Sequence, residues 1–198
     1  GVAVGYNALD ANTTGDQNTA CGNNALGANT TGQYNSALGT QALINNTTAS
    51  NNTALGAFAL LSNTTGSENT AVGKEALYNN IGSSNNSAFG VTALYACTTG
   101  SNNTAIGQSA LKVSTTASKN TAVGRVAAFS LTTGNNNTFV GTECGYGTVD
   151  SFESVGVGYQ ALLADCGYQN VAVGSRALAS YTGDANVAMG NQALEDCT

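Results

Sequence analysis

The feature that most constrains this chain is a glycine that returns every 17 residues, and every 16 residues for the last two steps. Around each glycine the sequence stays close to Asn-Thr-Ala-Val-Gly-x-x-Ala-Leu-x-x-Asn-Thr-Thr-Gly-x-x. Repetition at a fixed period is the signature of a solenoid, in which each unit packs on its neighbours. The sequence therefore predicts one continuous repeat array over residues 1–198, uncapped at both ends. The recurring glycines are Gly5, Gly22, Gly39, Gly56, Gly73, Gly90, Gly107, Gly124, Gly141, Gly158, Gly174 and Gly190.

A repeat of this length, called a coil below, is too short for two packed helices with their turn, so strands are expected. The stretches Thr-Ala-Val and Ala-Leu-x suit two strands, and the glycine and the Asn-Thr-Thr-Gly segment suit the corners between them. Successive coils would pair in parallel at about 4.8 Å. The predicted fold is all-β: a flattened parallel β-solenoid of about twelve coils.

Side chains alternate across a strand, so the columns can be assigned by size. The residue before each glycine is large and apolar, as in Val72 and Phe89, and this pre-glycine column is predicted to form the core. A leucine column, including Leu77 and Leu94, would face it from the opposite strand. By alternation, the alanine before each pre-glycine residue is then predicted to point outward.

An outward ribbon of small apolar residues is typical of a seam where another chain approaches closely. The alternative is a monomer whose alanines line a tight corner. A broken aromatic stripe after the leucines is a second contact candidate, unless its rings simply stack between coils. The candidate self-association residues are Ala20, Ala37, Ala54, Ala71, Ala88, Ala105, Tyr78, Tyr95 and Phe129.

The segments Asn-Ser-Ala-Leu-Gly at 35–39 and Asn-Thr-Ala-Val-Gly at 69–73 resemble the head repeats of trimeric autotransporter adhesins. They are also similar to the repeat shafts of some bacteriophage tail fibres. The resemblance implies a left-handed β-roll, an obligate trimer and adhesion to a host surface. The repeat here is about three residues longer than the usual head unit and adds the Asn-Thr-Thr-Gly corner, so the trimer contacts are expected to differ.

Composition excludes several function classes. Only 8% of residues are charged, the net charge is −6 and the five basic residues are scattered, so no cationic stripe is available for nucleic acid. No apolar run is long enough to enter a membrane. There is no histidine, and Glu75, Glu143 and Asp165 are isolated acids, so neither catalysis, a metal site nor a cofactor is expected.

The sequence contains two sets of Asn-x-Ser/Thr sequons, which a glycosylating secretory route would modify. The alternative is structural: asparagine tolerates left-handed corners and stacks into amide ladders. The candidate glycosylation residues are Asn12, Asn29, Asn45, Asn46, Asn51, Asn63, Asn85, Asn102 and Asn136.

Three further features need an explanation. One threonine column, Thr13, Thr30, Thr47, Thr64, Thr98, Thr115 and Thr132, suggests an ice-binding solenoid as an alternative function. Residues 142–170 depart most from the repeat, through drift or through recognition. Among the five cysteines, Cys144 and Cys166 lie on successive coils and could be bridged. The alternative is free thiols that substitute for other repeat residues, as Cys21 does for valine, and Cys197 lies too far from Cys166 to pair with it.

The function expected from these observations is a non-enzymatic, extracellular fibre segment on a cell or virion surface. Its partners would be copies of itself, as a trimer or an end-to-end filament, and a cell-surface or glycan receptor. The alternatives are the ice-binding solenoid and a receptor-binding shaft of the phage type.

Overall fold

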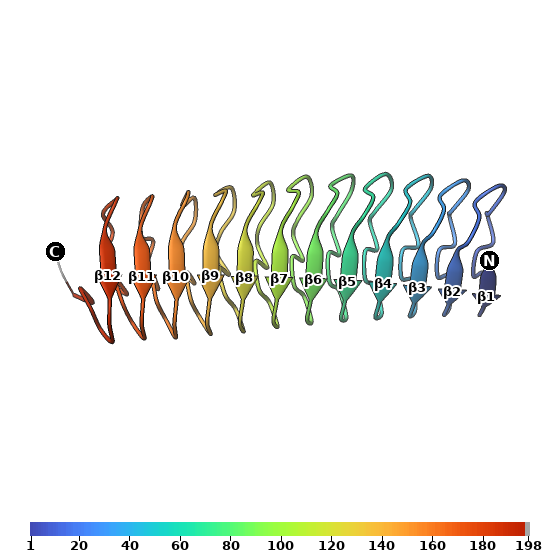
Figure 1. Cartoon of the computed structure of the whole chain (residues 1–198). Helices are drawn as coiled ribbons and strands as arrows, with labels where there is room; N and C mark the ends of the chain where they lie inside the picture. Colours follow the sequence, from blue (N-terminus) through green and yellow to red (C-terminus); the bar gives the residue numbers. More distant parts are fainter. Residues whose placement is uncertain (197–198) are drawn as a thin grey trace.

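The computed structural model describes residues 1–196 and is an all-β solenoid. Its single parallel sheet has 12 strands, and each strand is hydrogen-bonded to the strands before and after it in sequence. The strands follow one another along a rod, with β1 and β12 at opposite ends (Figure 1). They are β1 Val2–Val4, β2 Thr19–Cys21, β3 Ser36–Leu38, β4 Thr53–Leu55, β5 Thr70–Val72, β6 Ser87–Phe89, β7 Thr104–Ile106, β8 Thr121–Val123, β9 Thr138–Val140, β10 Val155–Val157, β11 Val171–Val173 and β12 Val187–Met189.

The register places like residues over one another, as the repeat predicts. Ala54 of β4 pairs with Ala71 of β5, and Ala71 pairs with Ala88 of β6. The shorter final repeats keep this alignment, because Val155 of β10 pairs with Val171 of β11. The predicted parallel solenoid is therefore confirmed.

Each coil contains one strand rather than the predicted two. The Ala-Leu stretch forms turns because the residues two and four positions after the glycine are left-handed, with φ 58° at Glu75 and 51° at Leu77. Their amides nevertheless reach both neighbouring coils. The Glu75 N–H donates to the Ala57 carbonyl of the preceding coil, and the Leu77 N–H donates to the Ala93 carbonyl of the following coil, both at 3.0 Å. This wall thus holds the coils together without strand geometry.

The leucines of this wall occupy a backbone region that leucine disfavours. The left-handed conformation costs about 1–2 kcal/mol per residue, whereas complete burial of a leucine side chain contributes about 1.5–3 kcal/mol. Burial and the amide bonds to the next coil together outweigh the backbone cost. The predicted leucine column is confirmed as core, except that Leu9 is half-buried and Leu194 is 43% exposed. Its fully buried members are Leu26, Leu43, Leu60, Leu77, Leu94, Leu111, Leu162 and Leu178.

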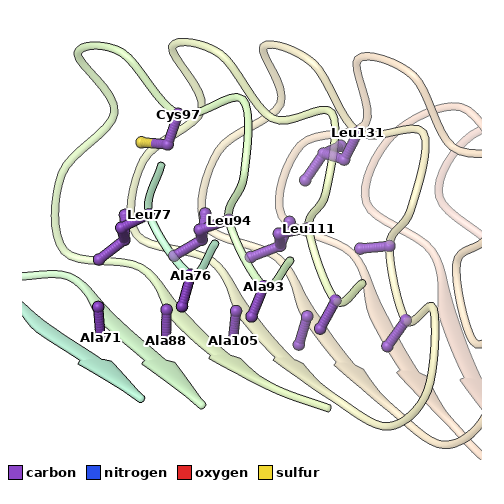
Figure 2. Packing of buried hydrophobic residues seen from close by; sticks show 14 of the residues in the cluster. Ala71, Ala76, Leu77, Ala88, Ala93, Leu94, Cys97, Ala105, Leu111 and Leu131 are labelled. Atoms are coloured by element: carbon purple, nitrogen blue, oxygen red, sulfur yellow. The ribbon is translucent and has the colours of Figure 1, made fainter. Parts of the chain in front are cut away.

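The alanine column points inward, which corrects the predicted phase of the strand. Ala71, Ala88 and Ala105 are 0% exposed and project from their strands toward the leucines (Figure 2). A second buried alanine, such as Ala76 or Ala93, follows most of the recurring glycines by three residues and fills the adjacent corner. The interior is therefore narrow: one leucine and two alanines fill most of it in most coils, and a large strand residue would not fit beside them.

The recurring glycine lies where the backbones of successive coils approach closely. Gly73 has φ 132°, and a Cβ added there would lie 2.6 Å from backbone atoms of Gly90 in the next coil. Any other residue would face both an unfavourable φ and a backbone collision. The period of the glycines therefore sets the period of the fold.

Buried amide side chains complete the interior. The asparagine before each strand accepts from the backbone N–H of its counterpart in the next coil, and its own amide donates to a turn carbonyl. Asn103, for example, accepts from Asn120 N–H at 3.0 Å and donates to the Ala117 carbonyl at 2.8 Å. This continuous asparagine ladder satisfies backbone groups that no strand pairs. It comprises Asn18, Asn35, Asn52, Asn69, Asn86, Asn103, Asn120, Asn137, Ser154, Asn170 and Asn186, with serine in one coil.

Candidate functional site

The outward face of the sheet carries a row of large apolar side chains. In each strand the middle residue points inward, so the first and third residues face solvent. The pre-glycine column is the third residue, and its members Leu38, Leu55, Phe89 and Ile106 are 49%, 42%, 40% and 42% exposed. The prediction that this column forms the core is therefore wrong. It forms an apolar stripe along the rod instead.

Threonine and serine side chains run beside this apolar stripe, as the first residue of most strands. Between the two columns lies a shallow groove of about 280 Å³, with Leu38 and Leu55 on one side and Ser36 and Thr53 on the other. The surface is thus mostly methyl and methylene groups with a hydroxyl edge. Contiguous apolar surface of this extent is typical of contact with another molecule.

The residues first proposed for self-association lie elsewhere. Ala20, Ala37, Ala54, Ala71, Ala88 and Ala105 are at most 2% exposed, so they cannot contact a second chain, and this part of the prediction is wrong. The aromatic candidates are half-buried. Tyr78 stacks on Tyr95 with centroids 5.1 Å apart, and Phe129 stacks on Tyr146 at 5.3 Å. Stacking between coils, the alternative explanation, therefore describes their packing.

The irregular coils at residues 142–170 are explained in part by core packing. Phe139 takes the place of a strand alanine and is completely buried, while Gly145 replaces the facing leucine. A Cβ at Gly145 would lie 2.6 Å from the Phe139 ring, and one at Gly156 would lie 2.7 Å from Cys144 Sγ. One large residue thus fills the space released by two small ones. These glycines are packing adjustments rather than signs of a site.

The acidic residues do not converge on a catalytic or metal centre. Glu75 pairs with Lys74 at 3.2 Å and Glu143 with Arg125 at 2.6 Å, so each carboxylate is paired with a base and not with a second acid. Asp165 accepts the Val149 N–H at 3.1 Å. Within residues 1–196, no three histidine, cysteine or acidic side chains are grouped as metal ligands would be.

The glycosylation candidates separate by burial. Asn29, Asn46 and Asn63 are 0% exposed, and they form a short amide ladder with Asn12 and Asn80 through Nδ2 to Oδ1 bonds of 2.8–3.0 Å. A glycan on these three would have to pass through the core, so the amide-ladder alternative describes them. Asn12, at the end of the ladder, is half-buried. The exposed candidates are Asn45, Asn51, Asn85, Asn102 and Asn136.

The threonine column of the ice-binding alternative is engaged within the protein. The Thr13 hydroxyl donates to the Thr30 carbonyl of the next coil at 2.9 Å, and the Thr30 hydroxyl donates to the Thr47 carbonyl at 3.0 Å. The same bond recurs along the column. Its hydroxyl protons therefore stabilise coil stacking and are not offered to solvent, and nothing in this geometry favours the ice-binding alternative.

The four described cysteines are free thiols, and the bridge considered between Cys144 and Cys166 is absent. Burial raises the pKa of Cys144 to about 12 and that of Cys166 to about 11. Burial likewise raises the pKa of Cys97. Cys21, in the pre-glycine column, is half-exposed. Cys197 lies outside the described residues.

These thiols make a testable contrast, because the thiolate is the reactive form. In the folded protein at about pH 8, iodoacetamide should label Cys21 and leave Cys97, Cys144 and Cys166 unmodified, as read by peptide mass spectrometry.

The pKa of Cys144 rises from 9.0 to about 12 on folding. The contribution of the Cys144 thiol to the free energy of unfolding is therefore complete below pH 9 and is lost as the pH rises toward 12. In this range the thiol of the unfolded chain ionises while the buried thiol stays protonated, which favours unfolding. Cys144→Ala should lose this alkaline component, and fast labelling of native Cys144 would contradict the assignment.

No family model, curated protein sequence or solved structure gives a significant match to this chain. Residues 1–196 include no helix with the length and apolarity required to cross a bilayer. The surfaces described above are therefore the basis for any functional assignment.

Proposed function

We propose that this chain is a segment of a non-enzymatic fibre whose copies associate laterally through the outward face of the sheet. The observation that carries this is the apolar stripe of pre-glycine residues, which runs the length of the rod. Burial of apolar surface contributes about 25 cal/mol per Å², so a repeated contact of this kind gains stability with every coil added.

The arrangement proposed is a trimer in an extracellular or virion-surface fibre, as the resemblance to adhesin heads and phage shafts implies. Closed symmetry would place the same stripe of each copy at the shared interface. The buried alanines are not part of it. The contacts would instead come from residues such as Leu55, Phe89 and Ile106, with the threonine column at the rim.

A charge placed in the stripe should separate the copies. Leu55→Lys combined with Ile106→Lys puts two ammonium groups where apolar contact is proposed, and burying an unpaired charge costs several kcal/mol. Light scattering should show a wild-type mass of three chains and a variant mass of one. Circular dichroism should be unchanged, because both side chains point away from the core.

The matched control is Ile81→Lys, since Ile81 is 52% exposed but lies in a bend between β5 and β6, outside the strands. Its mass should equal that of the wild type. Negative-stain microscopy of the wild type should show rods and would reveal end-to-end joining. A wild-type protein that stays a single chain at all concentrations, or a stripe variant that keeps the wild-type mass, would overturn the proposal.

A further inference from the structure

A hollow on the turn wall of the solenoid, opposite the sheet, combines aromatic, aliphatic and polar side chains. It has a volume of about 530 Å³. Phe129 and Tyr146, stacked with centroids 5.3 Å apart, form one side together with Leu163. Its lining residues are Arg125, Val126, Phe129, Glu143, Tyr146, Gln160 and Leu163. They come from three successive coils, so the repeat itself brings them together.

The polar side of the hollow has hydrogen-bonding capacity to spare. Glu143 accepts from Arg125 at 2.6 Å through Oε1 and from Gln160 Nε2 at 2.8 Å through Oε2. These bonds hold the carboxylate in place but use only two of its roughly four acceptor sites. The Gln160 carbonyl and most N–H groups of Arg125 also remain for a ligand. The side chains are thus preorganised by one another, which reduces the entropy lost on binding.

The charges of the residues that line the hollow are balanced, because Arg125 neutralises Glu143. Lys112 does not line the hollow, and its Nζ lies 5.8 Å from the centre of the Phe129 ring. The chain as a whole carries −6. An anionic ligand would meet this overall negative charge, and a strongly cationic one would have to compete with Arg125 for Glu143. A neutral ligand with an apolar side and many hydroxyl groups matches the lining best.

We propose that this hollow binds a neutral saccharide. One C–H side of a sugar ring would lie against Tyr146 and Leu163. Its hydroxyls would donate to Glu143 and to the Gln160 carbonyl and would accept from Arg125. Aromatic contact and charge-assisted hydrogen bonds are what fix orientation in a mostly apolar pocket. The inference deepens the expected adhesive role of the fibre and rests on the proposed function only for its biological meaning, because a single chain contains every lining residue.

The test uses the full chain and a panel of neutral glycans: maltotetraose, cellotetraose, chitotetraose and lactose. Saturation-transfer NMR detects binding, and titration gives the Kd. At least one of the four should bind at millimolar concentration or tighter. Tyr146→Ala should weaken it about tenfold through loss of the aromatic contact, which corresponds to about 1.4 kcal/mol.

A second variant guards against misfolding of the first. Gln160→Asn keeps a residue that tolerates the left-handed φ of 55° but shortens the amide, and it should also weaken binding severalfold. The matched control is Tyr78→Ala, which removes a tyrosine from the same column outside the hollow, where it stacks on Tyr95. This control should bind like the wild type.

The proposal is overturned if no glycan of the panel binds, if both hollow variants bind as tightly as the wild type, or if Tyr78→Ala loses affinity equally. Preference for a sialylated tetrasaccharide over every neutral one would also overturn it. Because the stripe variant Leu55→Lys/Ile106→Lys keeps the hollow intact, it should retain binding even as a single chain. Failure of self-association is therefore distinguishable from failure of sugar binding.

Discussion

Replacing Phe139 by alanine is expected to lower the free energy of unfolding by about 3–5 kcal/mol. The ring is completely buried in the alanine column. Neither Gly145 nor Gly156 has a side chain that could move into the space it leaves. Denaturant unfolding followed by circular dichroism measures the loss. Phe152→Ala removes a phenylalanine that is 36% exposed and packs on Tyr168, so it should cost clearly less than Phe139→Ala and serves as the control.

The partner change tests whether the two positions compensate. Gly145→Leu alone should also destabilise, because its Cβ would meet the Phe139 ring at 2.6 Å. Phe139→Ala with Gly145→Leu restores the alanine and leucine of the other coils, and leucine tolerates this left-handed position elsewhere in the wall. The double variant should recover most of the stability, with a coupling energy of at least about 2 kcal/mol. A double variant as unstable as Phe139→Ala alone would show that the substitutions are independent.

Much of the fold could be predicted from the sequence because the repeat is read directly. The glycine period fixed where coils stack, and the leucine column was placed correctly inside. The phase of the strand was not predictable from size. In Thr-Ala-Val, alternation shows that Thr70 and Val72 share a face but not which face is inside. Which face is inside depends on the width of the whole cross-section. Leu77 and Ala76 fill most of that width, so only a small strand residue fits inside.

The turn wall and the hollow were missed for related reasons. Leucine disfavours positive φ, so local propensity predicted a strand where tertiary burial imposes turns on residues such as Leu77. The hollow depends on the ion pair between Arg125 and Glu143, which lie on neighbouring coils. In the sequence these residues are 18 positions apart and look like two unrelated charges. The continuous asparagine ladder was visible in principle. An asparagine recurs before most strands with the period of the glycines. This position is not a corner, so the left-handed backbone does not explain the asparagine, whereas a buried hydrogen-bonding role does.

Breaking this ladder is expected to have the second large effect. Asn103→Ala removes the bond to the Ala117 carbonyl and the acceptor of the Asn120 N–H, and both of those groups are buried. Each buried group left without a partner costs about 1–3 kcal/mol, so the loss should be about 2–6 kcal/mol. Hydrogen exchange should show the Asn120 amide losing protection first, because each coil depends on its immediate neighbours.

The ladder offers its own graded control. Ser154 occupies the equivalent position in a later coil, where its hydroxyl accepts the Asn170 N–H at 3.2 Å. Asn103→Ser should therefore keep part of the acceptor function and cost less than Asn103→Ala. Asn79→Ala, at a half-buried asparagine outside the ladder, should change stability by less than about 1 kcal/mol. If all three variants lost equal stability, the hydrogen bonds of the continuous asparagine ladder would not be what stabilises the stacking of the coils.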